Sequence, residues 1–290
     1  MTRLPLIARR AEELLGAAVI ATAPVAGGDI STATRIRLSD GTTALIKTHH
    51  QAPDGFFDAE ARGLTWLAEA AGPETGGVLV PEVLGHDHEC LILRWVEPGK
   101  NTVDAAAALG QALARTHRAG AAAYGAEHDG FIGRLPMPNR TAPTWPEFYA
   151  TRRVLPYLKL ARDRGAATED DAAAVEAVLR RIDTLVPTEP PARLHGDLWN
   201  GNVLWGLDGA CRVIDPAAYG GHREVDLAML SLFGLPHLHR VLDAYEEEHP
   251  LAEGWRDRLG IHQLFPLLVH ACMFGGGYGA RAAETARRFG

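Results

Sequence analysis

The spacing of apolar residues changes near residue 100, and this change limits the folds open to the chain. Residues 25–50 alternate apolar and polar side chains across two turn signals, one of them Gly27-Gly28, which predicts a three-stranded meander. From Asn101 onward the apolar residues recur mostly at helical spacing. We therefore expect an α+β chain with a β-rich N-terminal part and a mostly helical C-terminal part.

Local signals refine this outline. Residues 81–99 predict a hairpin whose second strand, 90–96, is apolar apart from Arg94 and should be buried. The division between the two parts is expected at residues 97–102, which gives an N-terminal lobe, 1–98, and a C-terminal lobe, 99–290. Helices are predicted at 2–16, 53–72, 102–119, 144–164, 169–186, 225–233, 238–249 and 255–273.

Composition excludes several classes of protein. The 290 residues are 47% hydrophobic and 22% charged, enough for a full core, and the net charge is −7 without a Lys/Arg block. Neither a secretory signal nor a run of about 18 apolar residues is recognisable. We expect a cytoplasmic protein that binds neither membrane nor nucleic acid. Its three cysteines, Cys90, Cys211 and Cys272, should be reduced residues of the core.

The segment LHGDLWNGNVLW, residues 194–205, concentrates polar groups between two apolar runs. Asn202 follows Asp197 by five residues, the spacing of the H-x-D-x-x-x-x-N catalytic loop, and Asp215 ends the next apolar strand. Phosphoryl transfer to an alcohol needs a carboxylate to accept the hydroxyl proton and oxygen ligands for magnesium. We therefore predict Asp197 as the base, and Asn202 and Asp215 as Mg²⁺ ligands.

A second group of residues suits the phosphates of ATP. Lys47 ends an apolar strand, and Glu60 on the following helix could orient its ammonium toward the phosphates. Gly27 and Gly28 could bring backbone amides to the triphosphate. The apolar strand that ends near the lobe boundary supplies Leu93, Arg94 and Trp95, whose backbone groups could pair with an adenine edge.

These residues together resemble the aminoglycoside phosphotransferase superfamily and, more closely, the fructosamine (ketosamine) kinases. The closer resemblance rests on LHGDLW at 194–199, IDPA at 214–217, YGGHREVDLA at 219–228, WPEFY at 145–149, HQLF at 262–265 and FGGGY at 274–278. It implies a bilobal protein-kinase-like fold, use of ATP and Mg²⁺, and phosphorylation of a sugar hydroxyl on a ketosamine, which leads to deglycation.

The resemblance also implies further roles. Trp199 would lie against the sugar and Glu224 would contact the substrate, while His195 and Asp226 would support the catalytic loop. The ketosamine could be free or bound to a protein, and a monomer is favoured. Some relatives have a cysteine after Gly27-Gly28 that permits a redox-linked dimer; here Asp29 stands there, so no such switch is expected.

Alternatives remain at this point. The chain could be another small-molecule kinase, acting on an aminoglycoside, choline or a thiosugar, or a non-catalytic nucleotide-binding protein. Residues 86–89, HDHE, are more typical of a solvated turn than of a zinc site, and the same holds for His222, His237 and His239. Residues 246–248, EEE, favour a solvated helix face over a wall for a cationic substrate.

Overall fold

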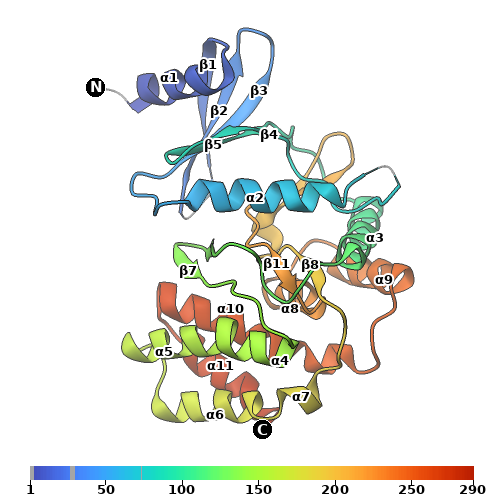
Figure 1. Cartoon of the computed structure of the whole chain (residues 1–290). Coiled ribbons are helices and arrows are strands. Elements are labelled where there is room, and N and C mark those ends of the chain that lie inside the picture. The colour runs from blue at the N-terminus through green and yellow to red at the C-terminus, as the bar shows by residue number, and fades with distance from the viewer. Residues whose placement is uncertain (1–2, 27–29, 73) are drawn as a thin grey trace.

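The computed structural model describes residues 3–26, 30–72 and 74–290, and these form two lobes (Figure 1). The N-terminal lobe is built on a five-stranded antiparallel sheet in the order β1-β2-β3-β5-β4. The meander and the hairpin predicted from sequence are thus joined through β3 and β5. The strands are β1 (Val19–Val25), β2 (Thr32–Leu38), β3 (Thr43–Thr48), β4 (Val83–His86) and β5 (Cys90–Arg94).

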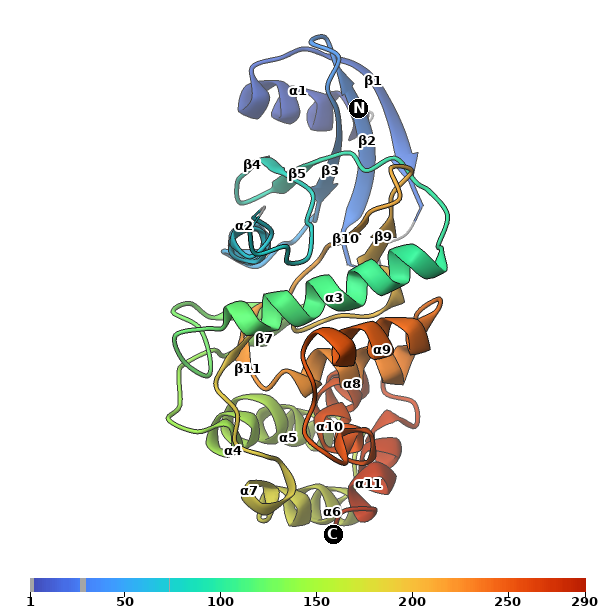
Figure 2. The ribbon, with the colours of Figure 1, turned by 90° about the vertical axis from the view of Figure 1, so that its right-hand side faces the viewer.

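Two helices cover this sheet, α1 (Arg3–Leu15) and α2 (Phe56–Glu69) (Figures 1 and 2). Cys90 and Ile92 of β5 pack in one apolar cluster with α1, whereas Leu91 and Leu93 pack in another with α2. Because successive side chains of a strand point to opposite faces, β5 is buried on both sides. This arrangement explains its nearly unbroken apolar sequence and confirms that the strand is central.

The C-terminal lobe is mostly helical, as expected, and carries short two-stranded sheets near the interface with the N-terminal lobe. The connection between the lobes is fixed to the β9–β10 hairpin, because Gly99 N–H donates to Trp205 O (2.7 Å) and Leu207 N–H donates to Glu97 O (2.8 Å). The helices are α3 (Val103–Ala119), α4 (Trp145–Phe148), α5 (Leu155–Asp163), α6 (Glu169–Leu179), α7 (Ile182–Leu185), α8 (Glu224–Phe233), α9 (Leu238–Glu248), α10 (Trp255–Phe274) and α11 (Tyr278–Arg287); the strands are β6 (Gly130–Ile132), β7 (Leu135–Met137), β8 (Ala192–Leu194), β9 (Val203–Trp205), β10 (Cys211–Val213) and β11 (Tyr219–Gly221).

Each predicted helix is present, but several elements differ in detail from the prediction. The helix expected at 144–164 contains a π-helical turn, η1 (Tyr149–Val154), just before Pro156, whose missing N–H removes one regular hydrogen bond. The helix expected at 169–186 is broken into α6 and α7, because Arg181 leaves the helical conformation (φ −122°, ψ 4°). The strand β5 ends at Arg94 instead of Val96, and α11 and the β6–β7 hairpin were not predicted.

Other expectations concern single residues or whole segments. Cys90 and Cys272 are buried and Cys211 is half-buried, and all three are free thiols, as expected. Among the helices that the described residues form, none is long and apolar enough to cross a bilayer. Gly27, Gly28 and Asp29 lie outside the described residues.

Candidate active site

A cavity of about 1100 Å³ lies between the two lobes and gathers most of the residues singled out from the sequence. Lys47 and Glu60 line it from the N-terminal lobe, and Asp197, Asn202 and Asp215 line it from the C-terminal lobe. Residues separated by up to 168 positions in the sequence therefore face one space.

The loop that carries Asp197, expected from sequence to be catalytic, begins where β8 ends, and its backbone geometry requires glycine at one position. Gly196 has φ 82°, and a Cβ there would lie 2.0 Å from Ala217 O. Asp197 follows directly and stands half-buried at the cavity wall. Asn202 closes the loop, since its Nδ2 donates to Asp197 O (2.8 Å) and to Asp197 Oδ2 (3.2 Å).

This hydrogen bonding decides which atom of Asn202 faces outward. Its amide nitrogen is used inside the loop, so its Oδ1 remains as an acceptor, the kind of oxygen that Mg²⁺ prefers. Burial and the nearby Asp215 raise the pKa of Asp197 to about 7, and the donated bond from Asn202 opposes the rise only in part. A carboxylate with a pKa near neutrality is suited to accept a proton from a hydroxyl group.

Beneath the loop, Asp226 is completely buried and uses both carboxylate oxygens. Its Oδ1 accepts the N–H of Gly196 (2.9 Å), and its Oδ2 accepts the N–H of His195 (2.8 Å). The Nε2 of His117, on α3, lies 3.0 Å from the same Oδ2, and its Nδ1 lies 2.8 Å from the Tyr245 hydroxyl. Burial alone would raise the pKa of Asp226, but hydrogen bonding and electrostatic attraction from His117 keep this pKa below its ordinary value.

His195 lies in the same buried layer. Its Nε2 is 2.9 Å from Ile214 O, and its Nδ1 accepts the N–H of Asp197 (3.2 Å). A ring that accepts at Nδ1 and donates at Nε2 is neutral, which agrees with the lowering of the His195 pKa by burial. His195 thus ties the catalytic loop to the strand that leads to Asp215.

Lys47 stands between two carboxylates. Its Nζ lies 2.6 Å from Glu60 Oε1 and 2.5 Å from Asp215 Oδ1, so the pair of Lys47 and Glu60 expected from sequence is present with a third member. Burial alone would lower the pKa of Lys47, but attraction to both carboxylates raises it. Burial raises the pKa of Glu60 to about 7, whereas Lys47 overcomes the effect of burial on Asp215 and lowers its pKa.

Asp215 occupies a strained turn at the end of the short β10 segment. Its φ of 54° is in the left-handed region, which few residues other than glycine, Asn and Asp adopt. Ile214 N–H donates to Asn202 O (3.0 Å), so the two expected metal ligands are held on adjacent backbone segments. An amide oxygen of Asn202 and a carboxylate oxygen of Asp215 that lies away from Lys47 form an oxygen donor set that fits Mg²⁺.

Leu93, Arg94 and Trp95, expected from sequence to contact a nucleotide, line the cavity. Their backbone N–H groups are partly used, however, because Arg94 N–H donates to Glu82 O (2.8 Å) and Trp95 N–H to Thr43 O (3.1 Å). These two donors are not free for an adenine edge. The expected glycine loop at Gly27 and Gly28 falls outside the described residues, although its neighbours Val25, Ala26, Ile30 and Ser31 line the cavity.

Trp199 also lines the cavity, and its indole lies against the backbone of Gly201, where a Cβ would be only 2.5 Å from the ring. Phe233 contacts it edge-on at 6.3 Å between ring centroids. Phe233 in turn stacks on His270 (4.6 Å), which packs against Tyr278 (5.2 Å). Tyr278 of the FGGGY segment is therefore linked to Trp199 indirectly, through His270 and Phe233.

Glu224 does not contact this cavity, and its expected role at the substrate is corrected. The side chain is completely buried at the start of α8, and both of its carboxylate oxygens accept hydrogen bonds from Arg258 (2.7–3.0 Å). His262 Nε2 lies 3.2 Å from Glu224 Oε2. Burial alone would raise the pKa of Glu224, but His262, and after it Arg258, outweigh burial and lower this pKa to about 2.

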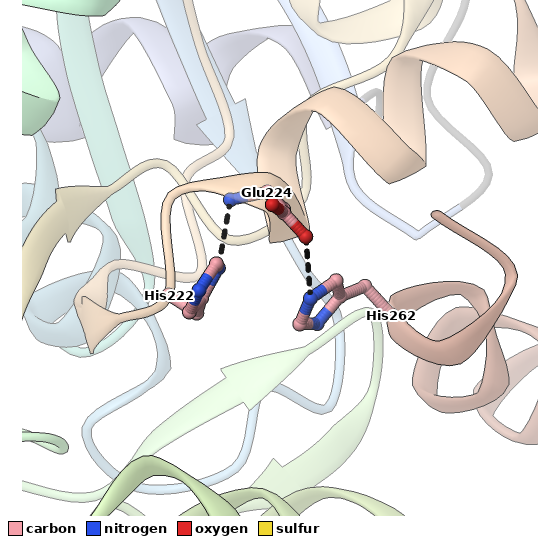
Figure 3. A group of neighbouring side chains, drawn as sticks. All are labelled: His222, Glu224 and His262. Atoms are coloured by element: carbon pink, nitrogen blue, oxygen red, sulfur yellow. Dashed lines mark hydrogen bonds and ion pairs between the residues drawn. The ribbon is translucent and has the colours of Figure 1, made fainter. Parts of the chain in front are cut away.

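His222, Glu224 and His262 have the composition of a metal site, and one potential ligand atom from each lies within 4.8 Å of those of the other two (Figure 3). The two nitrogens of His222 are already used, however: Nδ1 accepts the N–H of Glu224 (3.3 Å) and Nε2 lies 3.2 Å from Pro187 O. The guanidinium of Arg258 also supplies the positive charge beside Glu224. Hydrogen bonds from Arg258 to Glu224 join α10 to α8, and with this cation already bound to the carboxylate the group does not fit a divalent cation.

Sequence analysis missed His117. Its only local signal is a histidine within the alanine-rich face of α3, and its partner Asp226 lies 109 residues away. The three glutamates at 246–248 agree with the expected solvated face, because each pairs with surface arginines: Glu246 with Arg256, Glu247 with Arg240, and Glu248 with Arg115 and Arg118.

The sequence and the fold both resemble known kinases. A family model described as fructosamine kinase matches residues 4–289. A protein of Thermus thermophilus named as a probable ketoamine kinase is 39% identical over 256 residues, 88% of each chain. A crystal structure from Thermobifida fusca, assigned by name to fructosamine-3-kinase, superposes with a TM-score of 0.89 at 50% identity over 97% of each chain. The gentamicin–APH(2″)-IIa complex shares the fold, with a TM-score of 0.64 at 14% identity over 100% of this chain and 98% of that chain.

Proposed function

This chain belongs to the fructosamine kinase family and is a phosphotransferase that acts on a hydroxyl group, and on that premise we propose how its residues transfer phosphate from ATP to the sugar of a ketosamine. ATP use is implied by the family, and a divalent metal is typical of the fold. The observation that carries the proposal is the meeting of Asp197, Asn202, Asp215 and the Lys47–Glu60 pair in one cavity.

Asp197 accepts the proton of the attacking sugar hydroxyl. Its raised pKa and its single hydrogen bond from Asn202, among the described residues, leave one carboxylate oxygen directed to this task. Lys47 holds the phosphates that are not transferred, and Glu60 aims its ammonium. Asn202 and Asp215 would hold Mg²⁺, which would supply positive charge to offset the charge that develops on the phosphate oxygens.

The two lobes have different proposed roles. Residues 1–98 form the nucleotide-binding lobe, where Gly27, Gly28, Leu93, Arg94 and Trp95 surround ATP. Residues 99–290 form the catalytic and acceptor-binding lobe. In that lobe Trp199 presents a flat apolar face to the C–H side of the sugar. Phosphorylation destabilises the ketosamine and releases its amine, so the biological outcome is deglycation. The proposal also takes the protein to be a cytoplasmic monomer.

A parallel assay tests this proposal. ATP consumption is measured with a fructosyl amino acid, a ribulosyl amine and an aminoglycoside. We expect turnover of at least one ketosamine and none of the aminoglycoside. Turnover of the aminoglycoside alone would reject the ketosamine as substrate, and absence of turnover with all three would reject it in favour of a different acceptor. The family match over residues 4–289 already disfavours these alternatives.

A further inference from the structure

One face of α2 forms the upper wall of the cavity beyond the catalytic aspartates. Ala59, Arg62, Gly63 and Trp66 follow one another at helical spacing and all line the cavity. Gly63 allows this face of α2 to pack closely against the segment that follows Asp215. A Cβ at position 63 would be 3.0 Å from Pro216 and 3.4 Å from Ala218. The segment after α3, residues 121–131, lines the same space from below α2 (Figure 1).

The two ends of this wall are held by specific contacts. At the start of α2, the ring of Phe56 lies 5.3 Å from that of Phe131. Near its end, the Arg193 guanidinium lies 4.7 Å over the ring of Trp66 and donates to Trp66 O (2.5 Å). Arg62 lies between these ends on α2 and directly precedes Gly63, the residue whose backbone faces Pro216 and Ala218.

Arg62 differs from the other cations of the cavity. Lys47 is bound by Glu60 and Asp215, and Arg94 is bound by Glu82. Arg62 is exposed to the cavity, and within the part of the chain that the structure describes no carboxylate or carbonyl oxygen pairs with it. A guanidinium offers two parallel N–H donors that match the two oxygens of a carboxylate.

We propose that Arg62 binds a carboxylate on the amine part of the ketosamine, so that the preferred substrates are sugar adducts of α-amino acids. This inference rests on the proposed function. In such an adduct the carboxylate is separated from the amine nitrogen by a single carbon, and only a short chain of atoms separates it from the sugar hydroxyls. A carboxylate so close to a hydroxyl at Asp197 would stay within the same cavity, which Arg62 also lines. Glu127 and Asp129 line the lower wall and suit the protonated amine nitrogen.

A pair of substrates that differ in one charge tests the proposal. Fructosyl-glycine and fructosyl-glycinamide have nearly the same size, but only the first carries a carboxylate. We expect the wild-type kcat/KM to be about 10- to 100-fold higher for fructosyl-glycine, the effect of one charge-assisted pair. In Arg62→Gln this ratio should fall to about 1, with an unchanged KM for ATP. Arg62→Lys should keep part of the preference.

Arg37→Gln is the matched control, because Arg37 is an exposed arginine of the same lobe that does not line the cavity. It should keep the wild-type ratio. Equal wild-type turnover of the two compounds, or a preference for the amide, would overturn the inference while leaving the proposed function in place. An equal loss for both in Arg62→Gln would assign Arg62 to the phosphates and overturn it as well. Failure to phosphorylate either compound, or any ketosamine, would instead reject the proposed function on which it rests.

Discussion

The two sets of buried charges on either side of the catalytic loop differ in how fully their oxygens are used. Below the loop, both oxygens of Asp226 are bound by two backbone N–H groups and His117. In the cavity, Asp197 has one donor among the described residues, and one ammonium serves both Glu60 and Asp215. A fully satisfied carboxylate holds the backbone in one conformation, whereas a partly satisfied one can exchange partners when a ligand arrives. Substitutions at the cavity residues and at Asp226 test this distinction.

The largest effects are expected at Asp197 and Asp215. Asp197→Asn should lower kcat by about 10²–10⁴-fold, roughly 2.7–5.4 kcal/mol, while MgATP binding stays nearly intact. Asp215→Asn should first raise the concentration of Mg²⁺ that is needed for activity. Steady-state kinetics with a magnesium titration and calorimetry separate the two. If MgATP affinity collapsed in Asp197→Asn and persisted in Asp215→Asn, the assignment of base and ligand would be wrong.

Lys47 comes next, because it is the cation that the cavity carboxylates share. Lys47→Met should reduce kcat/KM by roughly 10²–10³-fold, the usual cost of removing one group that stabilises a developing charge. Glu60→Gln should be milder, since the ammonium remains but is less well aimed. Turnover of both variants at the wild-type rate would show that the ion pair is only structural.

Substitution of Asp226 should lower the stability of the fold and leave the magnesium requirement unchanged. Asp226→Asn leaves His117 and two loop N–H groups without their shared carboxylate, so we expect the free energy of unfolding to fall by about 3 kcal/mol. The measurement is urea denaturation, with the magnesium dependence of residual activity as the second readout. A wild-type unfolding curve combined with a shifted magnesium requirement would place Asp226 with the cavity carboxylates.

Trp199 tests an uncharged member of the cavity. Trp199→Ala should raise the KM for the ketosamine by an amount that corresponds to about 0.5–1.5 kcal/mol, while the KM for ATP is unchanged. Phe233→Leu, which removes the ring behind Trp199, should give a weaker effect of the same kind. Equal increases for both substrates would indicate that Trp199 supports the loop.

Stability should also depend on pH through Asp197. The pKa of Asp197 is raised to about 7 in the folded chain, whereas an unfolded chain has an ordinary value near 4. The folded protein therefore holds this proton more tightly, and the stabilisation is lost as pH rises from about 4 through about 7. Asp197→Asn lacks this titration, so its Tm should exceed that of the wild type by a few degrees at pH 8 and match it near pH 4. Parallel Tm curves over this range would show that the pKa is not raised.

Sequence alone predicted what depends on local spacing. The strand that ends at Lys47, the helix that carries Glu60 and the Asp197–Asn202 spacing each follow from short apolar or polar patterns, and the structure brings these residues together. Glu224 and Asp226 show the limit of such reasoning. They are two residues apart on α8, so their side chains point in different directions, one toward Arg258 and one toward the loop. The motif contains both, but only the packing of α8 against α10 decides which one approaches the active site.

The left-handed conformation of Asp215 restricts which residues this position can hold, apart from any requirement of catalysis. Asn and Gly adopt a φ near 54° with little strain, whereas Ala carries a cost of roughly 1 kcal/mol and β-branched residues carry more. Saturation mutagenesis scored only by soluble yield should therefore recover Asp, Asn and Gly at position 215 ahead of all other residues. The same constraint makes Asp215→Asn, and not Asp215→Ala, the suitable variant for measuring the metal requirement at this position without added backbone strain.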